Sequence, residues 1–151
     1  MASLIEVRRL LRFSDHRQQR CEQALGSARR RLSPLEQELD AIDQQDEGFR
    51  ELLLSNRMEA QTVSHSQLFA QLRRQAVIRR QIATLDLERA RVRERHGEVV
   101  EQLDDLQQQR KSLLGRHAKY QHLEQRLLAE HRARRWRLEE HDIEELLVKK
   151  K

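Results

Sequence analysis

Residues that commonly build pockets and rigid loops are scarce in this 151-residue chain. Aromatic side chains make up 3% of it, and it has one cysteine, one proline and four glycines. With so few large rings, a deep apolar ligand pocket is not expected. The single cysteine, Cys21, excludes an internal disulfide and fits a reducing compartment. These shortages argue against a small-molecule enzyme, so we expect neither an enzymatic activity nor a small-molecule substrate.

Long apolar stretches are also missing. No uninterrupted apolar run exceeds three residues, and the first residues lack the apolar segment of a secretory signal. The four glycines are isolated rather than grouped into a phosphate-binding loop, and the seven histidines lack the spacing of a zinc-binding helix. We therefore expect a cytoplasmic protein with no cofactor and no metal.

Charge is abundant instead, at 36% of residues, with a net charge of +5 and a pI near 10.0. Arginine blocks such as 29–31, 73–74 and 79–80 are interspersed with acidic residues. They fit either solvated helix faces or contacts with phosphate, acidic protein surfaces or anionic lipid. A basic coiled-coil structural or nucleic-acid-binding protein is thus one alternative, although the interleaved acids and rare aromatics make nucleic acid an unlikely partner.

Apolar residues recur every three or four positions along the first part of the chain. Such a 3.5-residue period keeps one seam turned toward a partner helix and is typical of a coiled coil. Four polar residues interrupt the stripe: Ser14, Gln18, Asp46 and Asn56. The apolar members are Leu4, Val7, Leu11, Cys21, Leu25, Ala28, Leu32, Leu35, Leu39, Ile42, Phe49, Leu53, Ala60 and Val63.

The helical pattern weakens after Gln61, and Ser64 followed by Gln67 has the form of a capping box. Val63 and Leu68 flank it as a hydrophobic staple, so a second helix is expected to begin near His65. A short connection makes the two helices antiparallel and places Leu4 near residue 123, within about one turn. The sequence therefore predicts an all-α fold, a long antiparallel two-helix coiled-coil hairpin. We expect one elongated domain, 1–151, with a first arm at about 3–61, a turn at about 62–65, a second arm at about 66–123, a C-terminal helical overhang at 124–148 and a tail at 149–151.

Three features of the arms lead to further expectations. One seam line of the second arm is nearly all apolar, whereas the other contains Arg89, His96, Arg110 and His117, which we expect to reach the solvent-exposed rim. Pro34 favours a kink in one continuous arm over two separate helices, since the heptad register persists across it. The overhang either frays or is covered by a partner. Its apolar residues are Leu127, Leu128, Trp136, Leu138, Ile143, Leu146, Leu147 and Val148.

The segment just past the predicted turn resembles a known protein family. The segment from Leu68 to Ile82, LFAQLRRQAVIRRQI, resembles the SpaM/InvI proteins of bacterial type III secretion systems, relatives of YscO and of flagellar FliJ. The opening from Leu4 to Leu11, the Ser64 cap and Tyr120-Gln121 ahead of an arginine-rich tail add to the resemblance. It implies a hairpin like the coiled coil of the rotary ATPase γ subunit, acting as the central stalk of the export ATPase at the inner-membrane secretion apparatus. The partners it implies are the hexameric export ATPase, an export gate protein and, in one view of the family, secretion chaperones.

Contact residues follow as hypotheses from this resemblance. Phe69, Leu72, Arg73 and Arg74, with Phe49 and Leu53 as further candidates, are expected to contact the export gate at the tip, although Phe49 and Leu53 also fit core packing. The arginines expected to contact acidic loops of the ATPase ring are Arg8, Arg9, Arg12, Arg132, Arg134, Arg135 and Arg137. Solvated charged faces are the alternative for the arginines.

Overall fold

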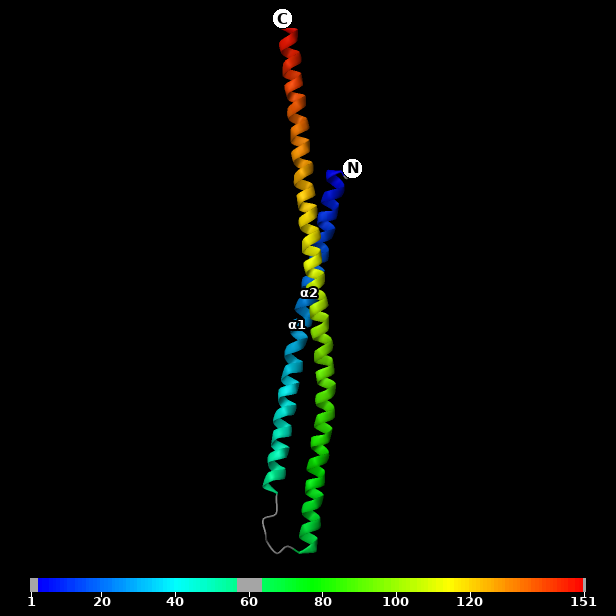
Figure 1. Ribbon diagram of the computed structural model, residues 1–151, viewed down its shortest axis with the longest axis vertical. Helices are drawn as coiled ribbons and strands as arrows, with labels where there is room; N and C mark the ends of the chain where they lie inside the picture. Colours follow the sequence, from blue (N-terminus) through cyan, green and yellow to red (C-terminus); the bar gives the residue numbers. More distant parts are fainter. Residues whose placement is uncertain (1–2, 57–63, 151) are drawn as a thin grey trace. The chain divides into compact units, whose positions relative to one another are not determined.

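The computed structural model describes residues 3–56 and 64–150, and within them it contains two α-helices (Figure 1). Helix α1 spans Leu4–Ser55, and helix α2 spans His65–Lys149. The described residues contain no strand. The chain is an all-α, antiparallel two-helix hairpin, which confirms the predicted fold class.

The packing of α1 against α2 divides into two units. Unit 1 combines Met1–Leu25 with Asp105–Lys151, and unit 2 is Gly26–Asp104. Each unit contains part of α1 and part of α2, so each has its own two-helix interface.

Both helices begin with a reciprocal capping box. At the start of α1, the Glu6 amide donates to Ser3 Oγ at 3.2 Å and the Ser3 amide donates to Glu6 Oε2 at 3.1 Å. At the start of α2, the Gln67 amide donates to Ser64 Oγ at 3.4 Å and the Ser64 amide donates to Gln67 Oε1 at 3.3 Å. Each box satisfies two backbone donors that the first helical turn leaves without partners. The predicted start of the second helix is confirmed.

Several expectations about the turn fall on residues that the structure does not describe. The end of the first arm near residue 61, the first half of the turn at about 62–65, and the seam residues Ala60 and Val63 lie within 57–63. The staple between Val63 and Leu68 also falls there. The division into arms, turn, overhang and tail therefore stays a prediction.

Pro34 lies inside α1 without splitting it, because one helix runs from Leu4 to Ser55. The expectation of one continuous arm is confirmed over two separate helices. Proline has no amide hydrogen, so the carbonyl of Arg30 lacks its usual intrahelical donor. The apolar seam continues on both sides of this position, with Leu32 and Leu35 half-buried. Seam packing is the physical reason that the helix tolerates the lost hydrogen bond.

Heptad residues form the core of both units. In unit 1, Val7 and Leu25 of α1 are fully buried, and Leu113 of α2 is buried as well. In unit 2, Ile42 packs in one cluster with Leu85 and Val92, surrounded by Leu35, Leu39 and Phe49. Phe49 is therefore a core side chain, the alternative that its place on the stripe suggested.

The polar residues that interrupt the stripe in α1 mostly bind α2. In unit 1, Ser14 is buried and its hydroxyl lies 3.1 Å from His117 Nδ1. In unit 2, the Asn56 carbonyl accepts hydrogen bonds from the side-chain amides of Gln71 and Gln75. Asp46 in unit 2 binds Arg89 of α2. Gln18 is the exception, since its buried Nε2 has no hydrogen-bond partner.

A ladder of pairs between carboxylates and Arg or His side chains crosses the seam at heptad spacing, and the two that contain His are ion pairs only when the imidazole is protonated. Each step of seven residues, or fourteen at one place, along α1 is matched by an equal step back along α2. We call these five pairs the cross-helix ladder. In unit 1 they are Arg8–Glu124 at 3.9 Å, Asp15–His117 at 3.6 Å and Glu22–Arg110 at 2.7 Å, and in unit 2 they are Glu36–His96 at 3.5 Å and Asp43–Arg89 at 2.9 Å.

The ladder corrects two expectations. The Arg and His side chains of the polar seam line of α2 were expected to reach the solvent-exposed rim. Arg110 does so, with 45% of its side chain exposed, whereas Arg89 and His117 are only 16% and 17% exposed and lie against carboxylates of α1. The register also differs from the predicted one. Because Arg8 lies beside Glu124, Leu4 lies opposite Leu128 rather than residue 123. The expected register assumed a fold about Val63, whereas the seam contacts fix the observed one.

Charge matching explains why this register is favoured over its neighbours. A slip of one heptad preserves the apolar seam. In one direction, however, it would bring Asp15 beside Glu124 and Arg50 beside Arg89. In the other direction it would place Asp43 beside the apolar Ile82. Each exposed ion pair contributes at most about 1 kcal/mol, so the ladder selects the register more than it adds stability.

Beyond Leu128, α2 has no partner within unit 1. Leu127 and Leu128 are half-buried, so α1 covers these two residues of the predicted overhang, contrary to expectation, as the observed register requires. Every described side chain from 129 to 150 is exposed. The helix nevertheless continues to Lys149.

Candidate functional site

The first group of predicted contact residues lies on the opening turns of α1, in unit 1. Arg9 and Arg12 are exposed, and Arg8 is half-exposed beside Glu124. Ile5 and Phe13, four residues to either side of Arg9, are 67% and 60% exposed. Since residues four apart share one helix face, these side chains form a mixed cationic and apolar surface. We call Ile5, Arg9, Arg12 and Phe13, with Arg17 one turn on, the α1 face.

Sequence reasoning found the arginines of the α1 face and missed its apolar members. The guanidinium carbon of Arg17 lies 5.7 Å from the centroid of the Phe13 ring, within the range of a cation–π contact. The signal was present, because Ile5 and Phe13 both lie off the 3.5-residue stripe. An apolar side chain off the seam of a two-helix coiled coil is left in solvent.

The second group is on α2, also in unit 1. Arg132, Arg134, Arg135 and Arg137 are all exposed. Arg8 is level with Glu124, so Arg132 lies eight residues, or about 12 Å, further along the α2 axis. The two arginine groups thus share one end of unit 1 without forming a single cluster.

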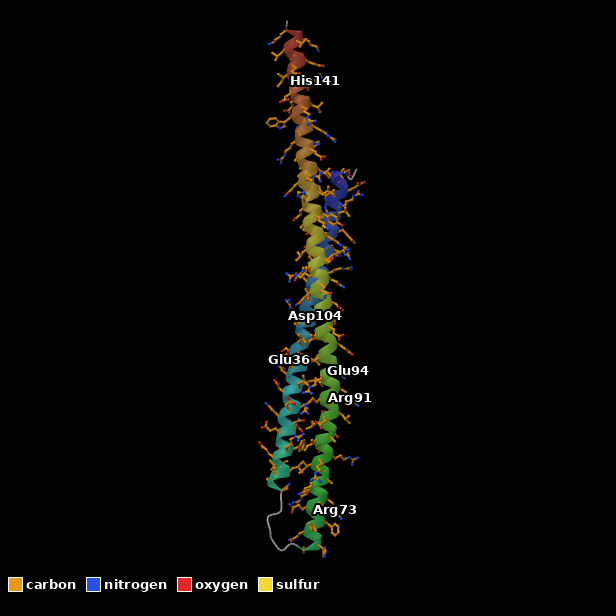
Figure 2. All side chains as sticks on the ribbon, viewed as in Figure 1. Glu36, Arg73, Arg91, Glu94, Asp104 and His141 are labelled. Carbon is orange, nitrogen blue, oxygen red and sulfur yellow. The ribbon has the colours of Figure 1, made fainter. Side chains whose placement is uncertain are left out.

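The predicted tip residues lie on the first turns of α2, in unit 2. Phe69 and Leu72 are 57% and 50% exposed, and Arg73 and Arg74 are exposed as well. Figure 2 labels Arg73 near the start of α2. Of the two α1 candidates, Phe49 packs in the core and Leu53 is half-buried. The four predicted contact residues of α2 therefore lie on the surface, whereas Phe49 lies in the core.

Other apolar side chains near this end were missed. Leu52 and Leu54 at the end of α1 are 49% and 60% exposed, and Val77 of α2 is 59% exposed. The sequence signal was the run Leu52-Leu53-Leu54, in which only the middle residue belongs to the stripe. We call Leu52, Leu54, Phe69 and Leu72, with Arg73 and Arg74, the tip residues.

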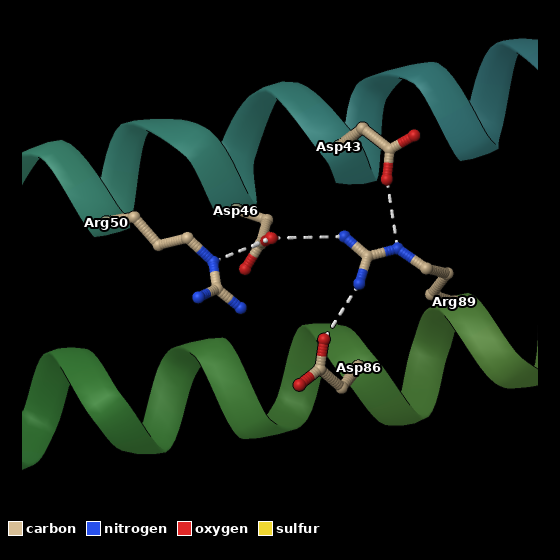
Figure 3. Close-up of polar contacts among 5 residues, drawn as sticks. All are labelled: Asp43, Asp46, Arg50, Asp86 and Arg89. Carbon is tan, nitrogen blue, oxygen red and sulfur yellow. Dashed lines mark hydrogen bonds and ion pairs between the residues drawn. The ribbon is translucent and has the colours of Figure 1, made fainter.

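The most connected polar site is centred on Arg89 in unit 2 (Figure 3). Its Nε donates to Asp43 at 2.9 Å, its Nη1 to Asp86 at 2.8 Å, and its Nη2 lies 3.3 Å from Asp46 Oδ2. Arg50 Nε donates to the same Asp46 oxygen at 3.1 Å. One guanidinium therefore links three carboxylates from both helices.

This environment shifts the pKa values of its central members. Burial acts to raise the pKa of Asp46, but hydrogen bonds from Arg50 and Arg89 outweigh it and hold the pKa below the usual 3.8. Burial acts to lower the pKa of Arg89, while hydrogen bonds to Asp46 and Asp43 raise it above its ordinary value. Both shifts favour the charged forms, as expected of a structural ion pair.

No group of three or more His, Cys, Asp or Glu residues in the described ranges is arranged to hold a metal ion. One shallow groove in unit 2 is lined by charged side chains such as Glu38, Glu88 and Arg91 around Ile42 and Val92. Figure 2 shows such charged side chains along both helices, Arg91 and Glu94 among them. Within 3–56 and 64–150, no helix is long and apolar enough to cross a membrane.

These features define a helical-hairpin protein with charge pairs along its seam and with exposed patches that combine apolar and cationic side chains. Residues 6–147 match the family model described as Salmonella surface presentation of antigen gene type M protein. The match covers nearly the whole chain, and the chain belongs to this family. It is accordingly a protein of the type III secretion apparatus, in agreement with the resemblance seen in the sequence. No curated protein and no solved structure gives a significant match.

Proposed function

We propose that this protein is the non-enzymatic central stalk of a type III secretion export ATPase. In this function it links the hexameric ATPase ring to the export gate at the cytoplasmic side of the inner-membrane secretion apparatus. The observation that carries the proposal is the family match over residues 6–147, which includes most of α1 and α2. The antiparallel hairpin adds support, because it is the fold that a γ-like stalk requires.

The ring contact is assigned to the α1 face and to the four exposed arginines near the end of α2, which are Arg132, Arg134, Arg135 and Arg137. A stalk in the pore of a hexamer meets six equivalent sites with one asymmetric surface. Charge interactions suit this task because they tolerate several orientations. Exposed guanidinium groups are also well shaped to bind carboxylates in acidic loops. Ile5 and Phe13 add apolar area that arginines alone lack.

The gate contact is assigned to the tip residues. Phe69 and Leu72 expose apolar surface beside Arg73 and Arg74, a combination suited to a partner groove with an acidic rim. The stalk acts by binding some ring conformations more tightly than others, which favours hexamer assembly and raises ATP turnover. Escort of secretion chaperones would use the same exposed surfaces.

Ring binding is tested by reversing the charge of two arginines near the end of α2. The variant Arg134→Glu with Arg135→Glu should lose capture of the hexameric ATPase at physiological salt and should lower its stimulation of ATP turnover. The matched control is Arg79→Glu with Arg80→Glu, two exposed arginines of α2 in unit 2. Full binding by the tail variant would rule out the ring contact.

Gate binding is tested separately by Phe69→Ala with Arg73→Glu. This variant should lose binding to the export gate and reduce secretion while still stimulating the ATPase. Leu87→Ala with Arg91→Glu, on the exposed surface of the same helix, is the control. Intact gate binding and secretion in the tip variant would contradict the assignment.

A further inference from the structure

A groove lies between the two helices near the end of α1, in unit 2. It has a volume of about 380 Å³ and is lined by Arg50, Leu53 and Leu54 of α1 and by Gln75 and Arg79 of α2. We call it the flank groove. Ligand sites commonly measure about 300–1,000 Å³, so a groove of this size suits a short peptide segment better than a whole domain.

Two exposed leucines lie on the same face of α2 as the groove. Leu68, Leu72, Gln75 and Arg79 are spaced by four, three and four residues, which places them along one helix face. Leu68 and Leu72 are 39% and 50% exposed, and Leu54 on the α1 side of the groove is 60% exposed. The groove therefore offers apolar surface beside its polar side chains.

Two of the lining side chains are held in place by neighbours. Arg50 Nε donates to Asp46 Oδ2 at 3.1 Å (Figure 3), and no described residue bonds the two terminal nitrogens of Arg50. The side-chain amide of Gln75 donates to the Asn56 carbonyl at 3.5 Å. Because these side chains are oriented before a ligand arrives, binding would cost less conformational entropy.

The lining of the groove is positively charged. Arg50 and Arg79 are both exposed, and no carboxylate is among the lining residues. The stretch of α2 from 64 to 85 contains four arginines and no aspartate or glutamate. Glu47 and Glu51 are exposed on the nearby part of α1, but neither lines the groove. Guanidinium groups bind carboxylates well, so the charge of the groove favours an acidic ligand.

We propose that the flank groove binds a segment of the export gate in which a large apolar side chain lies close to a carboxylate. The apolar side chain packs against Leu54 and Leu72, and the carboxylate binds Arg50 and Arg79. This assignment rests on the proposed function. It adds a second gate-binding site to the outward side of α2, which carries Phe69 and Arg73.

Other classes of ligand use only part of the groove. A phosphate compound would pair with the arginines and leave the leucines in water. A purely apolar ligand would cover the leucines but remove water from guanidinium groups without replacing their hydrogen bonds. A peptide segment with both kinds of side chain matches the apolar surface and the charge together.

A double substitution in the groove tests the proposal with the full chain. Binding to the purified cytoplasmic domain of the export gate is measured by isothermal titration calorimetry at physiological salt. Leu54→Ser with Arg79→Glu should raise the Kd by about tenfold or more, because it removes apolar contact and places like charges together. Both side chains are exposed, so the far-UV circular dichroism spectrum should remain that of wild type.

The matched control makes the same kinds of change elsewhere on α2. Leu87→Ser with Arg91→Glu alters two exposed residues outside the flank groove and should keep the wild-type Kd within about twofold. An equal loss of binding in this control would show that the groove variant acts through general charge, and it would overturn the proposal.

A photocrosslinker identifies the segment that occupies the groove. With p-benzoylphenylalanine in place of Leu54, irradiation should join the chain to a gate peptide, identified by mass spectrometry, that contains acidic and large apolar residues and has a net negative charge. A crosslinked gate peptide with a net positive charge would overturn the proposal. Crosslinking to residues 57–63 of the same chain, or to a second copy, would also overturn it.

Failure of the groove assignment and failure of the proposed function give different results. If Phe69→Ala with Arg73→Glu abolishes gate binding while Leu54→Ser with Arg79→Glu binds like wild type, the groove assignment is wrong and the gate contact stands. If wild-type protein does not bind the gate domain, the proposed gate contact is contradicted, and the partner assigned to the groove is contradicted with it.

Discussion

The Arg89 guanidinium of α2 lies 3.3 Å from the Asp46 carboxylate of α1, and both side chains are largely shielded, with 16% and 13% of their surface exposed. Asp46 occupies a seam position that an apolar residue would normally fill. Its second oxygen, Oδ1, is buried without a hydrogen-bond partner. The contact therefore places charge where a coiled coil usually has only apolar packing.

Loss of the cation should be costly, because it leaves Asp46 shielded from water with only Arg50 for neutralisation. Arg89→Met keeps the length of the side chain and should lower the urea midpoint of unfolding, followed by far-UV circular dichroism. Asp46→Asn added to Arg89→Met should cost less than the sum of the two single changes. Arg91→Met, on an exposed position nearby, should leave the midpoint unchanged. Strict additivity in this cycle would show that the pair is not coupled.

The lowered pKa of Asp46 predicts acid sensitivity of unit 2. A carboxyl whose pKa is lower in the folded state stabilises that state above its unfolded pKa, and this stability is lost as the pH falls through the folded pKa. The loss should therefore begin below about pH 4. Urea midpoints measured between about pH 7 and pH 2 should fall more steeply for wild type than for Asp46→Asn. The exposed Asp40→Asn variant should follow the wild-type curve, and equal slopes for Asp46→Asn would refute the prediction.

Leu25 is fully buried in unit 1 and has the largest such side chain in the described residues. Leu25→Ala should reduce the free energy of unfolding by about 2–5 kcal/mol, from lost burial and the cavity left behind. Leu87→Ala, at a position that is 65% exposed, should change it by less than about 0.5 kcal/mol. Similar losses at the two sites would contradict the assigned seam.

Pro34 is the opposite case, a residue whose replacement should stabilise the fold. Pro34→Ala removes the steric clash with the preceding turn and restores an amide donor for the Arg30 carbonyl. The free energy of unfolding should rise by about 1–3 kcal/mol, reduced somewhat because proline also restricts the unfolded chain. A lower stability for Pro34→Ala would mean that α1 depends on the local geometry that proline imposes.

Sequence periodicity was enough to predict the helical hairpin and the start of α2, because a heptad stripe and a capping box are local signals. The register could not be obtained in this way. It depends on which charges meet across the seam, and the Asp15, Glu22, Glu36 and Asp43 line was recognised only once its partners on α2 were known. The exposed apolar residues Ile5, Phe13, Leu52 and Leu54 were detectable in principle, since each lies off the stripe.

The antiparallel register underlies both proposed contact surfaces, and one distance tests it directly. Spin labels at Glu38→Cys and Glu94→Cys, in a Cys21→Ala background, occupy exposed positions two residues from the paired Glu36 and His96. Electron paramagnetic resonance on a sample diluted with unlabelled protein should give an intramolecular distance below about 30 Å, since packed helix axes are about 8–10 Å apart. A distance near 84 Å, expected for 56 residues of one unbroken helix, would contradict the hairpin.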